Sequence, residues 1–306
     1  MLQYPHIKMQ EVQRNFNSYH VAGIVPVAGS NSEFGFEWPD SFVPVAPNFT
    51  AIEAAVLECA HLGCETIWVV CNDDVSPIIK HRLGDYVQDV NSLQRGSFVR
   101  FSSEKYLSIP IYYVPIHPKH RDKLDCYAWS ILHGANVAYW LCRRLSRWMI
   151  PDRYYVSFPF GIYDPREAQS ARTELRKEEA FYFSFGGDTV CEGLPLGFTF
   201  DAEEWRRARD IIRSNSRTYY PPSAGEMPSR LLPKEERNKS RNYKLQDVFG
   251  DGPIKNATLK ELDWFYDLTT WDGYCKLLSS SHRKQIERPS KLVFSGGELN
   301  KLGEEE

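Results

Sequence analysis

The apolar and polar positions between residues 21 and 74 follow a strand pattern, then a helix pattern, then a strand pattern again. Residues 21–27 form an almost continuous apolar run, which is typical of a parallel strand covered on both faces. After a long loop, Thr50 and Glu53 have the spacing of a capping box, and apolar residues then recur at helical spacing. Residues 66–71 are a second apolar run. A long ordered loop after the first strand of such a unit usually holds a ligand.

The same alternation continues along the chain, with less regularity in the second half. Helical spacing predicts helices at residues 77–86, 125–149, 165–179 and 205–213, and apolar runs predict strands at residues 109–115, 154–160, 181–185 and 196–200. Thr258 and Glu261 again have capping-box spacing and predict a last helical segment. Residues 217–246, rich in Pro, Ser, Asn, Arg and Lys, predict an extended loop.

This order of elements predicts an α/β fold, with an open, mostly parallel sheet and helices on both of its faces. An irregular insertion is expected in the second half of the chain, at about residues 165–257. We expect a single domain over residues 1–285. The remaining residues, 286–306, predict a polar and acidic C-terminal tail, because they offer little apolar surface to fold around.

Composition limits the classes of partner. With 306 residues, of which 42% are hydrophobic and 25% charged, the chain has the composition of a soluble globular protein. A net charge of −3 does not indicate nucleic acid as a partner, and no apolar run is long enough to span a membrane. The seven cysteines form no CxxC pair and lie mostly in apolar segments. The N-terminal residues lack the apolar core of a signal peptide. We therefore expect reduced thiols and a cytoplasmic protein, either monomeric or oligomeric.

A turn of small residues follows the first strand and is the first candidate binding site. At Ala28, Gly29 and Ser30 the backbone N–H groups can approach a phosphate closely, because almost no side-chain bulk intervenes. Asn31 and Ser32 continue this loop and complete the candidate nucleotide-binding segment. A plain turn explains the glycine equally well.

Segments at both ends of the chain match motifs of one known family in the same order. The matching N-terminal segments are residues 25–30, 38–39, 42–45, 51–56 and 63–70. Residues 265–274, FYDLTTWDGY, are similar to a late motif, Trp-x-Asp-x-Gly-Thr-Trp-x-x-Tyr. On these segments the chain resembles the sugar-phosphate nucleotidyltransferases, which have a GT-A-like fold. The resemblance covers roughly residues 20–165 and 258–280.

The resemblance implies a nucleotide or nucleotide sugar as partner and Mg²⁺ as cofactor. Family members hold the metal with two carboxylates, and Asp267 matches the second of these. Phe160 stands at the position of the first, and Asp164 is the nearest acid beyond it, so Asp267 and Asp164 are the candidate catalytic and metal-binding residues. The cations also differ, because residues 29–37 lack the family's loop arginine and Asp40 replaces its lysine.

Other polar residues are weaker candidates for ligand binding. Candidate phosphate contacts, in what is otherwise a solvated basic loop, are Lys119, His120 and Arg121. Asp73 follows the second strand and can contact a ribose or base, with helix capping as the alternative. Residues 234–241, with Lys244 nearby, predict a solvated loop of mixed charge, and the alternatives are closure over a ligand or contact with nucleic acid.

Three functions are consistent with these observations. The first is transfer of NMP from an NTP to a sugar phosphate, with Asp267 and Asp164 holding Mg²⁺. The second is glycosyl transfer from a nucleotide sugar, which needs a metal–diphosphate site but not the loop cations. The third is a catalytically lapsed nucleotide-sensing or assembly subunit. We expect Gly29 and Asp267 to share one cleft, and the missing cations predict weak or absent nucleotidyl transfer.

Overall fold

A computed structural model describes residues 19–29, 32–89, 108–118, 126–145, 149–177, 179–216, 219–220, 231–239, 243–253, 256–288 and 294–295. The strands are β1 (Val21–Pro26), β2 (Pro44–Ala46), β3 (Phe49–Thr50), β4 (Thr66–Asn72), β5 (Tyr86–Gln88), β6 (Ser108–Ile116), β7 (Arg153–Val156), β8 (Gly161–Tyr163), β9 (Ala180–Ser184), β10 (Phe198–Phe200), β11 (Ala257–Glu261) and β12 (Phe265–Asp267). The α-helices are α1 (Ala51–Leu62), α2 (Ser76–Leu83), α5 (Tyr127–Leu145), α6 (Pro165–Ser170), α7 (Ala202–Asn215), α8 (Lys234–Lys239), α9 (Leu245–Phe249) and α10 (Trp271–Ser279). Short 3₁₀ turns are η1 (Asp40–Phe42), η4 (Ala171–Thr173), η5 (Val190–Glu192) and η6 (Ser281–Gln285).

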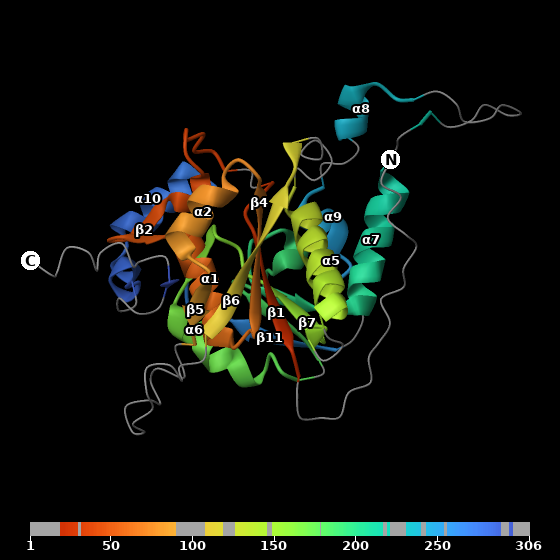
Figure 1. Ribbon diagram of the computed structural model, residues 1–306. Coiled ribbons are helices and arrows are strands. Elements are labelled where there is room, and N and C mark those ends of the chain that lie inside the picture. The colour runs from red at the N-terminus through yellow and green to blue at the C-terminus, as the bar shows by residue number, and fades with distance from the viewer. Residues whose placement is uncertain are drawn as a thin grey trace, which may run out of the picture.

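One eight-stranded sheet forms the centre of the molecule, in the order β11-β9-β10-β7-β1-β4-β6-β5 (Figure 1). The four strands β7, β1, β4 and β6 are parallel neighbours, and β11 is parallel to β9. Only β10 and the short edge strand β5 run antiparallel to their neighbours. The predicted open, mostly parallel sheet is confirmed.

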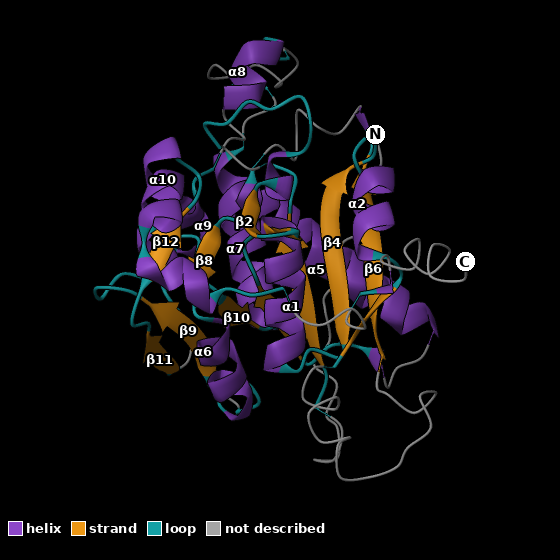
Figure 2. Ribbon diagram, turned by 90° about the vertical axis from the view of Figure 1, so that its left-hand side faces the viewer, coloured by secondary structure: helices purple, strands orange, loops and turns teal. Residues whose placement is uncertain are grey.

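Helices cover both faces of this sheet, as predicted. α5, α7 and α9 lie on one face, and α1, α6 and α10 lie on the other, which Figure 2 turns toward the viewer. In both views α8 stands apart from the sheet. In the part of the chain that the structure describes, no helix combines the length and apolar character needed to cross a membrane.

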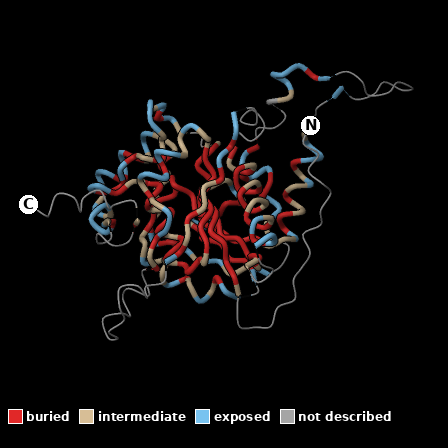
Figure 3. The backbone as a smooth tube through the Cα atoms, in the orientation of Figure 1, coloured by how far each residue is buried: buried red, intermediate tan, exposed pale blue. Residues whose placement is uncertain are grey.

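β1 lies between two apolar cores, which explains its unbroken run of apolar residues. The side chains of Val21 and Val25 pack in the core on the α1 side, whereas those of Ala22 and Ile24 pack in the core on the α5 side. All four are fully buried, and Figure 3 shows the buried segments gathered in the sheet between the helical layers. A strand without a solvent-facing side has no position for a polar residue.

The capping box predicted at the start of α1 is confirmed and is part of a buried ion cluster. Glu53 Oε2 accepts hydrogen bonds from the Thr50 backbone N–H at 2.9 Å and from its hydroxyl at 2.8 Å. The Glu53 side chain is fully buried and pairs with Arg82 at 2.9 Å and Arg288 at 3.2 Å. The box therefore links α1 to α2 and to the end of the described chain.

The helical segment predicted from the capping-box spacing at Thr258 is wrong. Thr258 and Glu261 lie in β11, at the edge of the main sheet beside β9. Glu261 accepts hydrogen bonds from the Ser184 hydroxyl and the Gly186 backbone N–H, both at 2.6 Å, so it joins two strands instead of beginning a helix. The capping-box spacing is present, but tertiary pairing decides the conformation.

Of the predicted fourth strand, residues 154–160, only the first three residues form a strand, as part of β7. β7 ends at Val156, and after a turn β8 pairs with β12 in a separate two-stranded ribbon. At Gly161 an added Cβ would lie 2.0 Å from the carbonyl oxygen of Pro195, so only glycine allows the chain to pass there. Within the stretch predicted to be an irregular insertion, residues 165–257, β9 and β10 join the main sheet.

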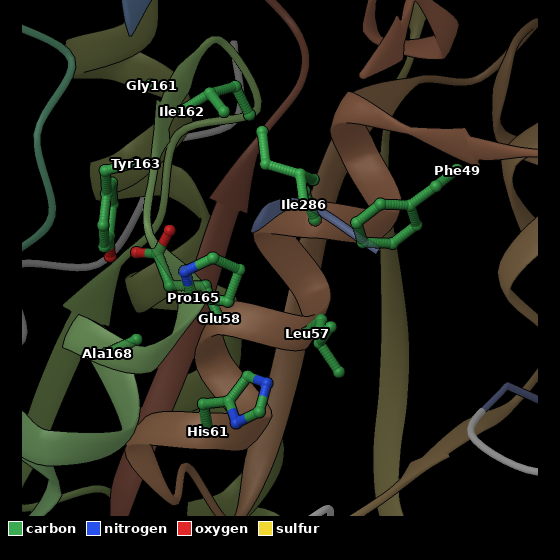
Figure 4. A pocket seen from close by; sticks show the side chains of 11 residues that line it. Phe49, Leu57, Glu58, His61, Gly161, Ile162, Tyr163, Pro165, Ala168 and Ile286 are labelled. Atoms are coloured by element: carbon green, nitrogen blue, oxygen red, sulfur yellow. The ribbon is translucent and has the colours of Figure 1, made fainter. Parts of the chain in front are cut away.

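A small cavity beside α1 contains a buried carboxyl group. Figure 4 shows the Glu58 carboxylate next to Tyr163 of β8, with His61 one turn further along α1. The cavity has a volume of about 30 Å³, which is room for about two water molecules. Burial raises the pKa of Glu58 to about 7, although hydrogen bonds, first of all from the Tyr155 hydroxyl, act to lower it. Burial also lowers the pKa of His61 to about 4.

We predict that Glu58→Gln changes how stability depends on pH. Because the pKa of Glu58 is raised on folding, its contribution is complete below the unfolded value of 4.5 and is lost as the pH rises toward 7. His61 acts in the opposite sense, since its lowered pKa removes stability as the pH falls from 6.5 toward 4. The free energy of unfolding of wild type, relative to Glu58→Gln, should therefore fall by on the order of 1–3 kcal/mol from about pH 5 to about pH 8.

Urea unfolding at both pH values measures this difference. Glu287→Gln, which removes an exposed carboxylate next to the cavity residue Ile286, is the matched control and should give a constant difference. A pH-independent difference between wild type and Glu58→Gln would contradict the raised pKa.

Candidate functional site

A cavity of about 250 Å³ lies at the carboxyl end of β1, where open α/β sheets bind their ligands. Five segments that are distant in sequence meet there: the turn after β1, the start of α5, the turn after η5, the start of α9, and the end of β12. The residues that line the cavity are Gly29, Cys126, Tyr127, Glu192, Gly193, Pro195, Tyr243, Lys244, Leu245, Gln246, Asp267 and Thr269.

The turn after β1 is held tightly against the start of α5. Ala28 donates its backbone N–H to Val70 O at 3.0 Å, and its carbonyl oxygen accepts the Ser130 hydroxyl at 2.6 Å. Gly29 has a φ of 78°, and an added Cβ would lie 2.5 Å from the backbone of Cys126. Glycine is therefore required by the close approach to α5 and by its left-handed conformation. Of the predicted nucleotide-binding loop, Ser30 and Asn31 lie outside the described residues.

Asp267 reaches the same cavity from the other end of the chain. β12 pairs with β8, and just beyond Asp267 the backbone N–H of Leu268 donates to Phe160 O at 2.8 Å. Asp267 Oδ1 accepts the Thr269 N–H at 2.9 Å, which fixes the carboxylate. Gly29 and Asp267 thus line one cavity, which is the arrangement that the sequence predicted.

The structure does not bring Asp164 to Asp267. The register of β8 with β12 places Asp267 opposite Gly161, so Asp164 lies about 10 Å further along the ribbon. The Asp164 carboxylate caps α6 and pairs with the Arg166 guanidinium at 2.6 Å, which lowers the pKa of Asp164. Of the two metal ligands that the sequence suggested, only Asp267 lines the cavity.

Phe160, at the position where the resemblance expects a metal-binding acid, belongs to the apolar core. It is fully buried, with its ring 6.3 Å from that of Phe34. In the described part of the chain, no group of three or more His, Cys, Asp or Glu side chains is arranged to hold a metal ion. Mg²⁺ often relies on one or two carboxylates together with substrate phosphates, so Asp267 fits this metal only in the presence of a phosphorylated ligand.

The loop after the turn is organised by Asp40, the residue that replaces the family's lysine. Its carboxylate accepts hydrogen bonds from the Ser32 hydroxyl and, at 3.2 Å, from the Phe36 N–H. Glu33 donates its N–H to Thr269 O at 2.8 Å, which ties the loop to the segment that carries Asp267. Ser32 is therefore part of the internal structure of the loop and does not line the cavity.

Stacked aromatic rings attach the same loop to α10. Phe36 lies between Phe34 and Trp38, with ring centroids 5.2 and 4.7 Å away. Trp271, at the start of α10, meets Phe34 edge-on at 4.7 Å. Such contacts are worth about 0.5–1.5 kcal/mol each beyond the area they bury. The loop is held by packing and carboxylate hydrogen bonds, and it brings no cation to the cavity among its described residues.

The remaining predicted contacts are either outside the cavity or outside the described residues. Asp73 follows β4 at the same edge of the sheet and donates its N–H to Ile116 O at 3.2 Å, but it does not line the cavity. The basic residues Lys119, His120 and Arg121 lie outside the described residues, so their contact with phosphate stays a prediction.

Glu192 and Tyr127 are among the polar cavity residues that the sequence analysis missed. Glu192 accepts the N–H of Thr189 at 2.7 Å and its hydroxyl at 2.8 Å, and these bonds lower the pKa of Glu192. Its capping-box spacing was visible in the sequence. Tyr127 gave no such signal. Among the described residues its hydroxyl is shielded from water without a hydrogen-bond partner, and burial, with the charges of Asp267 and Asp40, raises its pKa.

Comparison with known proteins identifies the fold. No family model and no curated protein matches this sequence. A solved structure described as a glucose-1-phosphate thymidylyltransferase from Bacillus anthracis, in complex with a sucrose, matches with a TM-score of 0.52 and 13% identity, over 88% of this chain and 98% of that chain. A UDP-glucose pyrophosphorylase complexed with UDP-glucose matches with a TM-score of 0.52 and 13% identity, over 87% and 99%.

The chain has the fold of the sugar-phosphate nucleotidyltransferases. At 13% identity the likeness concerns the arrangement of helices and strands. Activity has to be argued from the residues of the cavity.

We predict that Tyr127→Phe stabilises the protein by about 1 kcal/mol, because it removes a buried hydroxyl that lacks a partner. Urea unfolding measures the change. Tyr274→Phe is the matched control: its hydroxyl donates to Pro44 O at 2.9 Å, so its removal should destabilise by about 1 kcal/mol. An equal loss of stability in both variants would show that Tyr127 is satisfied in solution.

Proposed function

We propose that this chain binds a nucleotide or nucleotide sugar, as a Mg²⁺ complex, in the cavity at the end of β1, and that it transfers nucleotidyl groups slowly if at all. The observation that carries this proposal is the meeting of Gly29 and Asp267 in one cavity on this fold. Since the N–H of Ala28 is bonded to Val70 O, a phosphate here would rely on the N–H groups of Gly29 and of the first turn of α5. Asp267 presents the carboxylate suited to the metal.

The charges of the cavity support binding as a metal complex. The described lining contains two carboxylates, of Asp267 and Glu192, and one cation, Lys244. A free triphosphate would therefore meet more negative than positive charge in this lining. Asp267 together with the phosphates would hold Mg²⁺, whose charge would reverse this balance and whose Lewis acidity would serve nucleotidyl transfer.

Binding should therefore depend on both Mg²⁺ and Asp267. The calorimetric panel is UTP, ATP, GTP, CTP, dTTP and UDP-glucose. We predict that at least one of these ligands binds at least about 10-fold more tightly with Mg²⁺ than with EDTA, and that Asp267→Asn removes this difference. Isothermal titration calorimetry measures both. Asp272→Asn, an exposed acid on α10 that pairs with Lys276 at 2.6 Å, is the matched control and should bind as wild type does. Equal affinity with and without Mg²⁺ would contradict the proposal.

Slow transfer is expected because the groups that stabilise the transition state are engaged elsewhere or absent. Asp40 holds the loop, Phe160 belongs to the core, and Asp164 is paired with Arg166. Each lost electrostatic contact of this kind costs about 10²–10³ in rate. Several such losses together leave little nucleotidyl transfer even when binding is intact.

Release of pyrophosphate from each NTP with a panel of sugar phosphates tests this part of the proposal. We predict little or no turnover in wild type and no gain in Asp40→Lys, because that change removes the acceptor for Ser32 and Phe36. Robust pyrophosphate release that Asp267→Asn abolishes would overturn slow transfer. Release of UDP from UDP-glucose that requires Asp267 would favour glycosyl transfer instead.

A further inference from the structure

Lys244, the residue before α9, lines the cavity. It is the only lysine or arginine among the described residues that line the cavity. Its neighbours on both sides are buried: the Tyr243 hydroxyl donates to Ile212 O at 3.1 Å, and Leu245 packs in the core on the α5 side. The backbone at Lys244 is therefore fixed, while its side chain is exposed at the cavity.

α9 anchors this position to the main sheet. Val248 and Phe249 are buried, and the Phe249 ring lies 5.0 Å from Phe198 of β10. Because α9 is held in this way, the backbone of Lys244, the residue before it, has a fixed position. The ammonium group of Lys244 thus has a restricted region in which to find a partner, and the cavity lies within that region.

No described carboxylate neutralises Lys244. The nearest acid along the chain, Asp247, accepts the backbone N–H of Lys244 at 2.8 Å, but no ion pair to the ammonium group is formed among the described residues. Glu192, the other acid on this side of the cavity, is bound to Thr189. An ammonium group without an internal counter-ion, on the wall of a cavity that contains a candidate metal carboxylate, is suited to a phosphate oxygen.

We propose that Lys244 binds a phosphate group of the nucleotide and takes over the charge neutralisation that the loop no longer supplies. This inference rests on the proposed function. It places the metal-bound part of the diphosphate near Asp267 and Gly29, and another phosphate oxygen at Lys244. Because the contact is made to phosphate, it is independent of the nucleobase.

Titration calorimetry with uridine, UDP and inorganic pyrophosphate, each with Mg²⁺, tests this assignment. In Lys244→Met the affinities for UDP and pyrophosphate should fall by about 10–100-fold, as expected for loss of a charged hydrogen bond, and that for uridine should not change. Lys244→Arg should restore most of the affinity, since it retains the charge. Lys276→Met removes an exposed lysine outside the cavity and is the matched control.

The salt dependence of the affinity for UDP is a second measurement, and a loss of folding would not change it in the expected way. Affinity for UDP should fall less steeply with added salt in Lys244→Met than in wild type, because one charged contact is missing. If wild type binds UDP or pyrophosphate through Asp267 while Lys244→Met binds equally well, the assignment of Lys244 is overturned and the proposed function stands. If wild type binds neither these ligands nor any nucleotide of the calorimetric panel, both are overturned.

Discussion

The candidate site depends on the antiparallel pairing of β8 with β12. This two-stranded ribbon fastens residues 265–267, from the end of the chain, next to the segment that leaves the central strand β7. Gly161 makes the pairing possible, because any Cβ there would collide with Pro195 O. Without the ribbon, Asp267 would have no fixed position relative to Gly29, and the loop that begins at Ser32 would lose its attachment through Glu33 and Thr269.

The ribbon brings Gly29 and Asp267 to one cavity, while the charges around it differ from those that the resemblance implies. Asp40 stands where the resemblance expects a cation, Asp164 is the acid nearest to the expected metal-ligand position, and both are local structural acceptors. The backbone does not require these side chains to be catalytic, since Asp40 stabilises the loop and Asp164 caps α6. A fold can therefore persist after its electrostatics have altered, which is why function has to be argued from the site.

Local patterns predicted the parts of the structure that local interactions determine. Strand β1 could be predicted because burial on both faces leaves an unbroken apolar run in the sequence. The start of α1 could be predicted because the Thr50–Glu53 capping box is a pattern of only four residues. The same box pattern at Thr258 was misleading, because strand pairing with β9 outweighed a helical start that had no apolar stripe behind it. The break after β7 was not predictable, since it depends on the contact between Gly161 and Pro195. The juxtaposition of Gly29 and Asp267 came from the family resemblance, not from any local pattern.

The polar groups in and around the cavity differ in whether they have hydrogen-bond or ion-pair partners within the described chain. The carboxylates of Glu192, Asp40 and Asp164 all accept hydrogen bonds from donors within the chain, so removing any of them would destabilise the fold. In the described chain, Lys244 has no counter-ion and Asp267 has an internal donor to Oδ1 alone. Polar groups with internal partners have a structural role, because they stabilise the fold. Charged groups without such partners are stabilised only by water or a ligand. A carboxylate oxygen and an ammonium group that lack partners in the described chain, in the lining of one cavity, are complementary to a metal ion and a phosphate, which is why we propose one ligand for both residues.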